Sequence, residues 1–222
     1  KEISALRFSF DFDLWKQMMI YALPLILVGL GGMVNETLDR IMLGWWAPGG
    51  SPEANKAIVG IYSACYKLSI LITISVQAFR MSAEPFFFKQ ADTDNAPKTY
   101  ARVMKFFVIT LCIMFLMVAL YLDIWKAFIR NPAMYVGLKV VPILLLANIF
   151  LGIYYNLSIW YKLSNKTMAG AWITIIGAII TITINYLAIP YFGFMASAWA
   201  TFFCYGTMMV ISYKWGQKVY PI

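Results

Sequence analysis

The chain has 222 residues, of which 62% are hydrophobic and 17% aromatic, while only 13% carry a charge. Soluble domains carry about 25% charged residues, so this composition argues against a soluble protein and indicates a membrane protein. The absence of histidine from the sequence argues against HExxH zinc hydrolases and most metal sites. A net charge of +8 would suggest a nucleic-acid partner for a soluble protein. In a membrane protein, basic cytoplasmic segments explain that charge, and we expect no nucleic-acid binding.

Six stretches are long and apolar enough to cross a bilayer as helices, which requires about 20 residues each. They cover residues 14–46, 57–88, 103–122, 140–161, 169–189 and 195–213. A strand of a membrane β-barrel would have only about ten residues with alternating polarity, and these stretches show neither property. Residues 1–222 are therefore predicted to form an all-α membrane protein, a bundle of six transmembrane helices.

Lysine and arginine are distributed unevenly between the two sides of this bundle. If the N-terminus is cytoplasmic, the inner segments hold Lys1, Arg7, Lys16, Arg80, Lys89, Lys98, Arg102, Lys105, Lys162, Lys166, Lys214 and Lys218. The outer segments hold only Lys56, Lys126, Arg130 and Lys139. Because positive residues accumulate on the cytoplasmic side, both ends of the chain are predicted to be cytoplasmic.

Four polar residues interrupt the first stretch, in the sequence NETLDR: Asn35, Glu36, Asp39 and Arg40. A helix turns about 100° per residue, so these four side chains lie on one side of it, within about 140°. Charged groups inside a membrane usually face the bundle interior or a wet cavity. The Trp45–Trp46 pair marks the membrane exit after the charges. We therefore predict that the four residues lie in the outer half of the span and face the second helix.

The second stretch carries a polar stripe at helical spacing, formed by Tyr62, Tyr66, Ser69, Thr73, Gln77, Arg80 and Glu84. We expect this stripe to face the bundle interior or a wet cavity. The alternative is a polar seam between helices that binds no substrate. Arg80 and Glu84 are four residues apart, just before Pro85, which predicts either a cytoplasmic gate or a structural clamp.

Two charged residues are predicted to pair across these helices. Glu36 lies ten residues before Trp46, and Lys67 lies eleven residues after Lys56, so both side chains are expected at a similar depth. We predict a Glu36–Lys67 ion pair, with Arg40 beside Tyr62. The charges of Glu36, Asp39, Arg40 and Lys67 sum to zero, which limits the cost of placing them in the membrane.

The fifth stretch carries small and hydroxyl residues at helical spacing, namely Gly170, Thr174, Gly177, Thr181 and Asn185. Such a face usually indicates close packing of helices.

Several motifs carry a resemblance to a known family. They are NETLDRIMLG (35–44), GIYSACYKLSILITISVQAFRMSAEPFFFKQ (60–90), YARVMKFF (100–107), GIYYNLSIWYKL (152–163) and AIPYFGFMASAWAT (188–201). Together they resemble the bacterial polysaccharide-transporter branch of the multidrug/oligosaccharidyl-lipid/polysaccharide exporter superfamily, which includes the O-antigen flippases. The AFR…EPFFFK block is the most specific part. In the IPxxG element, Ala196 stands where a second glycine is usual, which suggests a looser turn.

This resemblance implies a MATE-like transporter with two six-helix lobes around a central cavity, of which this chain resembles the second. We expect the first lobe to be absent from this chain, which begins with Lys1 rather than Met. The implied activity is transfer of a polyprenyl-pyrophosphate-linked sugar between leaflets of the bacterial inner membrane by alternating access, without catalysis. The implied partners are that lipid-linked oligosaccharide, the bilayer and the missing lobe.

The substrate-binding residues expected from stripe and resemblance together are Asn35, Glu36, Asp39, Arg40, Tyr62, Tyr66, Lys67, Gln77, Arg80 and Glu84. Arginine and lysine suit a pyrophosphate, and tyrosine and amide groups suit sugars. No cofactor is expected, although the acids are candidates for a coupling proton or Na⁺.

Three other functions remain open. A cation-coupled multidrug exporter of the same superfamily would need an acidic, aromatic cavity, whereas Arg40 and Lys67 favour an anionic substrate. A membrane enzyme that polymerises or ligates glycans would need a large extracytoplasmic loop, but the longest loop here is the cytoplasmic segment 89–105. In a membrane scaffold, the polar faces would serve only to hold helices together.

Overall fold

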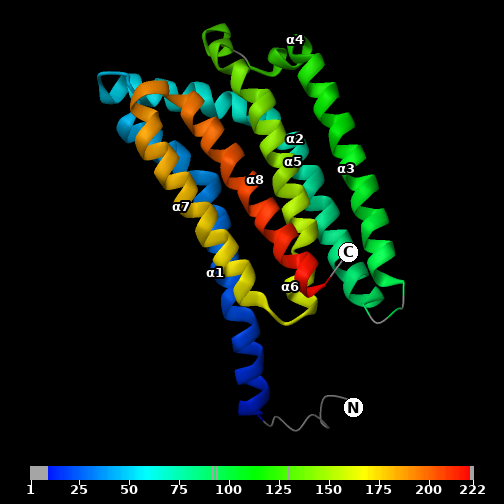
Figure 1. Cartoon of the computed structure of the whole chain (residues 1–222). Helices are drawn as coiled ribbons and strands as arrows, with labels where there is room; N and C mark the ends of the chain where they lie inside the picture. Colours follow the sequence, from blue (N-terminus) through cyan, green and yellow to red (C-terminus); the bar gives the residue numbers. More distant parts are fainter. Residues whose placement is uncertain (1–9, 92, 94, 130, 221–222) are drawn as a thin grey trace, which may run out of the picture.

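The computed structural model describes residues 10–91, 93, 95–129 and 131–220, and within these residues it is helical with no strand (Figure 1). Its elements are α1 (Phe12–Trp46), α2 (Pro52–Gln90), α3 (Ala96–Leu120), α4 (Leu122–Trp125), η2 (Lys126–Phe128), η3 (Pro132–Val140), α5 (Val141–Leu157), α6 (Ile159–Leu163), α7 (Thr167–Phe192) and α8 (Phe194–Val219). The prediction of an all-α fold is confirmed.

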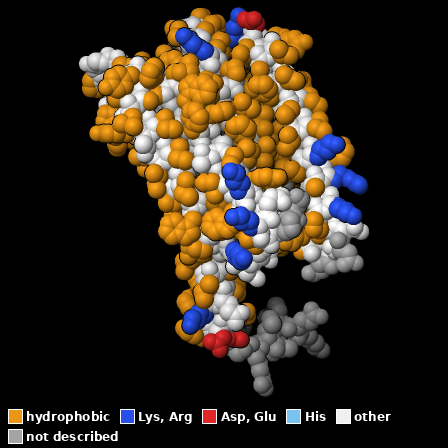
Figure 2. All heavy atoms as spheres, in the orientation of Figure 1, with side chains coloured by type: hydrophobic (Ala, Val, Ile, Leu, Met, Phe, Trp, Pro, Cys, Tyr) orange, Lys and Arg blue, Asp and Glu red, His pale blue; other side chains and the backbone are white. Residues whose placement is uncertain are grey.

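Six helical segments within the described residues are long and apolar enough to cross a membrane. Five are single helices, and the sixth runs from Pro132 to Leu163 through η3, α5 and α6. Each predicted span lies on one of these segments, although the third was placed too far along, since α3 ends at Leu120. Apolar side chains cover most of the visible surface (Figure 2). Such a surface fits contact with lipid, so the chain is a multi-pass membrane protein.

The helices are not equally buried. The span that contains α5 is the most enclosed, because 56% of its most apolar 18-residue stretch is buried. Helix α5 packs against α2, α3 and α8. The corresponding 18-residue stretch of α1 is only 6% buried, because α1 lies at the edge of the bundle against α7 (Figure 1). We name the two ends of the bundle after the short helices found there, the α4 end and the α6 end.

Local sequence explains where the long helices begin and turn. The backbone N–H of Ala54 donates to the Ser51 hydroxyl, and Pro52 occupies the first turn, so α2 has a capped N-terminus. Between α7 and α8, Gly193 adopts a φ of +54°, which side chains disfavour. This glycine allows the chain to reverse at the α4 end within one residue.

Close packing on α7 follows the small face predicted from the sequence. All five residues of that face are buried, which confirms the prediction. A Cβ on Gly177 would lie 2.5 Å from the Met208 sulfur on α8, and one on Gly31 of α1 would lie 2.5 Å from the Thr174 methyl group. The two glycines therefore let α8 and α1 approach the same helix.

Candidate functional site

The buried contact between α1 and α2 centres on an aspartate. The Tyr62 hydroxyl donates to Asp39 Oδ2 over 2.6 Å, and the Arg40 backbone N–H donates to Asp39 Oδ1 over 2.7 Å. Both side chains are enclosed, since Asp39 is 1% and Tyr62 0% exposed. Two donors thus compensate part of the cost of burying this carboxyl group.

Arg40 and Asn35 border this contact. The Arg40 guanidinium carbon lies 4.3 Å from the centre of the Tyr66 ring, a cation–π contact, and Arg40 Nε is buried with no hydrogen-bond partner among the residues that the structure describes. The Asn35 amide nitrogen lies 3.8 Å from the Met208 sulfur on α8, while its Oδ1 has no hydrogen-bond partner in the described part of the chain. The guanidinium group of Arg40 thus stacks on Tyr66, one helical turn along α2 from Tyr62, the neighbour predicted from the sequence.

The predicted Glu36–Lys67 ion pair is not formed. Both residues are exposed, and neither takes part in an ion pair among the described residues. Lys67 follows Tyr66, which faces α1, so its side chain points about 100° away from that face. Similar depth in the membrane is therefore not sufficient for Glu36 and Lys67 to form an ion pair, because the two side chains leave their helices in different directions.

The middle of the α2 stripe contacts α5. The Thr73 hydroxyl donates to Asn148 Oδ1 over 3.1 Å, and the Asn148 amide donates to the Leu144 carbonyl over 2.9 Å. Ser69 is fully buried and donates to the Tyr66 carbonyl in its own helix. This part of the stripe is a seam between helices.

Four residues meet near the α6 end of the same stripe. The Arg80 guanidinium carbon lies 4.6 Å from the centre of the Tyr155 ring, and Arg80 Nε lies 3.9 Å from Glu84 Oε1. Glu84 also accepts a hydrogen bond from the Lys162 ammonium group on α6. We call Arg80, Glu84, Tyr155 and Lys162 the α6-end cluster. It joins α2 to α5 and α6.

The α6-end cluster is partly open, unlike the Asp39–Tyr62 contact. The side chains of Arg80 and Glu84 are 38% and 32% exposed, whereas that of Lys162 is 11% exposed. A small pocket of about 10 Å³ is lined by Arg80, Glu84 and Tyr155, and also by Asn156. One turn away, Gln77 is exposed. The predicted stripe is thus buried in its first half and accessible in its second.

Sequence reasoning did not include Tyr155 or Lys162 among the site residues. Both lie in the motif GIYYNLSIWYKL, and Lys162 was expected only as a positive charge on the cytoplasmic side. Its tryptophan neighbour, Trp160, packs against Gly216 and donates to the Ser212 hydroxyl on α8. That packing fixes the short helix α6 and carries Lys162 toward Glu84.

Glu36 lines a second small pocket, with Tyr154, Tyr155 and Tyr205 among its other residues. The pocket has a volume of about 20 Å³, enough for about one water molecule. Within the described part of the chain, no three His, Cys, Asp or Glu side chains gather as they would around a metal ion.

The fold and these sites describe a multi-pass helical membrane protein with polar and charged groups along one inner helix. Residues 3–90 match the sequence model of a family described as "Polysaccharide biosynthesis protein". The matched region ends with α2, so it includes all ten candidate residues predicted from the sequence. No curated protein and no solved structure matched the chain. The family match supports a role in polysaccharide biosynthesis or export, and the helical bundle is consistent with transport.

Proposed function

We propose that this chain is one lobe of a transporter that carries a lipid-linked oligosaccharide from the inner to the outer leaflet. The substrate is a polyprenyl-pyrophosphate sugar, a precursor of O-antigen or another polysaccharide. A first six-helix lobe completes a central cavity, and the two lobes alternate between inward and outward openings. The family match at residues 3–90 and the six apolar helices support this proposal.

The observation that carries the proposal is the charge of the α6-end cluster. Arg80 and Lys162 share one carboxylate, Glu84, which leaves one net positive charge near a membrane-embedded face. A guanidinium group recognises phosphate oxygens through paired hydrogen bonds. Arg80 is 38% exposed and its Nε lies 3.9 Å from Glu84, beyond hydrogen-bond distance, so a pyrophosphate can compete for the guanidinium group.

Neighbouring groups suit the sugar part of such a substrate. The exposed amide of Gln77 lies one turn from Arg80, on the same face of α2. Tyr155 presents an aromatic ring beside the arginine. Amide and aromatic groups bind sugars through their hydroxyls and apolar ring faces. We therefore assign headgroup recognition to the second half of the α2 stripe and not to Lys67.

The orientation follows from the basic residues. The α6 end carries Lys89, Lys98, Arg102, Lys162, Lys166 and Lys218 near its helix ends. Positive residues favour the cytoplasmic side, so this end faces the cytoplasm in our proposal. The α6-end cluster then lies where a substrate made in the inner leaflet is first bound.

The Asp39–Tyr62 contact has a different role in this proposal. It joins α1 to α2 in the outer half of the bundle and is closed to substrate in this structure. It keeps the two helices together while the lobes move. The sugar and the pyrophosphate then contact side chains nearer the α6 end.

The test is leaflet translocation of a labelled lipid-linked oligosaccharide by the full-length protein in vesicles. We expect Arg80→Gln to slow translocation at least tenfold, because one phosphate contact is lost. Lys67→Gln is the matched control, since it removes an exposed charge that forms no ion pair within the described residues, and it should retain the wild-type rate. Unchanged transport by Arg80→Gln would remove the cluster from the mechanism. Absence of any translocation by the wild type would contradict the function itself.

A multidrug exporter of the same superfamily would place an acid among aromatic residues. Glu36 beside Tyr155 and Tyr205 has that composition. However, that pocket holds one acid, whereas Arg80 and Lys162 share a single carboxylate and leave one net positive charge at the α6-end cluster. The partly exposed cationic cluster therefore favours an anionic substrate over a cationic drug.

A further inference from the structure

A long groove lies on the surface between α3 and α8. It has a volume of about 410 Å³ and is lined mainly by apolar side chains, including Met104 on α3, Ile153 on α5 and Met209 on α8. It forms because α3 packs on α2 and α5, whereas α8 packs on α5 and α7. Helix α5 and the start of α6 therefore make the floor, and α3 and α8 make two separated walls.

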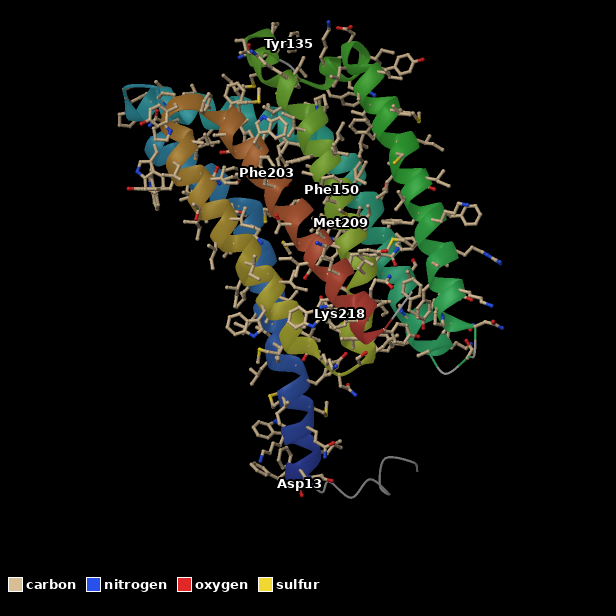
Figure 3. All side chains as sticks on the ribbon, in the orientation of Figure 1. Asp13, Tyr135, Phe150, Phe203, Met209 and Lys218 are labelled. Atoms are coloured by element: carbon tan, nitrogen blue, oxygen red, sulfur yellow. The ribbon has the colours of Figure 1, made fainter. Side chains whose placement is uncertain are left out.

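The groove leads toward the α6 end of the bundle. On α8 its lining extends from Met209 to Gln217, eight residues or about 12 Å of helix. Figure 3 places Met209 in the middle of α8 and Lys218 in its last turn. An extended acyl chain lying parallel to the helices fits this direction, with its headgroup at the membrane surface.

Positive charge flanks the groove at that surface. Lys105 lines the α3 wall, and Lys214 and Lys218 are exposed near the end of α8. Figure 2 shows two groups of Lys and Arg side chains, one along the lower part of α3 and one near the end of α8. Basic pockets between transmembrane helices bind anionic lipid headgroups.

A polar group in the floor gives independent support for a ligand. Asn156 is only 7% exposed and borders both the groove and the small pocket beside Arg80, and its Nδ2 has no hydrogen-bond partner among the described residues. Buried amide donors almost always have a hydrogen-bond acceptor, so an unpaired donor beside a groove indicates that a ligand supplies the acceptor. The ester carbonyl and phosphate oxygens of a glycerophospholipid are suitable acceptors.

From these observations we propose that the α3–α8 groove binds an anionic glycerophospholipid of the leaflet at the α6 end. The acyl chain lies along Met104, Ile153 and Met209, and the phosphate lies beside Lys105. This site lies between α3 and α8, whereas the α6-end cluster lies between α2, α5 and α6. The proposal therefore does not depend on the flippase function and can fail or succeed separately from it.

The test is native mass spectrometry of the full-length protein in detergent, titrated with phosphatidylglycerol or with phosphatidylcholine of the same acyl chains. We expect tighter retention of phosphatidylglycerol. Lys105→Gln should weaken phosphatidylglycerol binding about fivefold, because one cation near the lipid headgroup is removed. Val210→Trp should reduce retention of both lipids by filling the groove, and this exposed position tolerates a larger side chain without disturbing the core.

The matched control is Arg102→Gln, an exposed cation on the same helix outside the groove lining. It should change phosphatidylglycerol retention less than twofold. Equal effects of Lys105→Gln and Arg102→Gln would indicate surface charge alone and would overturn the site. Equal retention of both lipids would overturn its preference for an anion. Failure of Val210→Trp to alter retention, or occupation of the groove by another part of the full-length chain, would overturn the assignment of the groove to lipid.

Discussion

Replacing Tyr62 by phenylalanine removes one hydroxyl group from the bundle and leaves the shape of the side chain unchanged. That hydroxyl donates to Asp39 Oδ2 over 2.6 Å, at a site where both residues are at most 1% exposed. A hydrogen bond to a charged group contributes about 1.5–3 kcal/mol, and water cannot easily reach this position to replace the donor. We expect the free energy of unfolding to fall by about 1.5–3 kcal/mol.

The measurement is denaturant-induced unfolding of the full-length protein in detergent, followed by circular dichroism. Tyr191→Phe is the matched control, because Tyr191 is 80% exposed, and it should change stability by less than about 0.5 kcal/mol. Asp39→Asn, alone and combined with Tyr62→Phe, completes a double-mutant cycle. The two effects should be coupled by about 1 kcal/mol or more. Wild-type stability of Tyr62→Phe, or strictly additive losses in the cycle, would refute the reasoning.

Three further predictions use the same unfolding assay. Gly193→Ala should lower the free energy of unfolding by more than about 1 kcal/mol, because alanine disfavours the φ of +54° at this turn. An unchanged free energy of unfolding would contradict that account. Glu84→Gln should lower the free energy of unfolding more than Lys162→Met does. The first change leaves the 11% exposed Lys162 without its carboxylate, whereas the second leaves Glu84 with Arg80 nearby. The reverse order would be inconsistent with the burial of Lys162. The hydrogen bond from Lys126, together with its charge, lowers the pKa of Asp123. The pair therefore stabilises the fold fully when the pH is above the usual pKa of an aspartate, and this stabilisation is lost as the pH falls through the lowered pKa. Asp123→Asn should remove that contribution to the pH dependence of the unfolding midpoint, and an unchanged profile would show that the pair is not formed.

The positions of the six helices could be predicted from the sequence, because a membrane span leaves a long apolar signal. The close packing of α7 was also predictable, since Gly177 and its neighbours mark one face by their size. The ends were harder to place. Residues 132–140 form a 3₁₀ helix that continues into α5, and the predicted span began only at Val140. Hydropathy reports membrane burial, but it does not distinguish these helical forms.

Contacts between particular side chains were less predictable than the faces on which they lie. The stripe on α2 and the polar turn of α1 were both evident at helical spacing, and Asp39 does meet Tyr62. The partner of each charge depends on the rotation of both helices about their axes. Lys67 was assigned to Glu36 by depth alone, and a rotation of about 100° per residue was enough to separate them. Lys162 was missed because its position depends on the packing of α6 against α8.

The two interpretations of the α2 stripe apply to different parts of the same helix. From Tyr62 to Ser69, the polar groups are buried against α1 or bonded within α2, which is what a seam between helices requires. From Gln77 to Glu84, they are exposed or partly exposed, and together with Lys162 their charges sum to one net positive charge. Substitutions in the first half should therefore act mainly on folding, whereas conservative substitutions of Gln77 and Arg80 in the second half should act mainly on transport. Since both halves lie on one continuous helical face, spacing alone cannot separate them, and burial is the property that does.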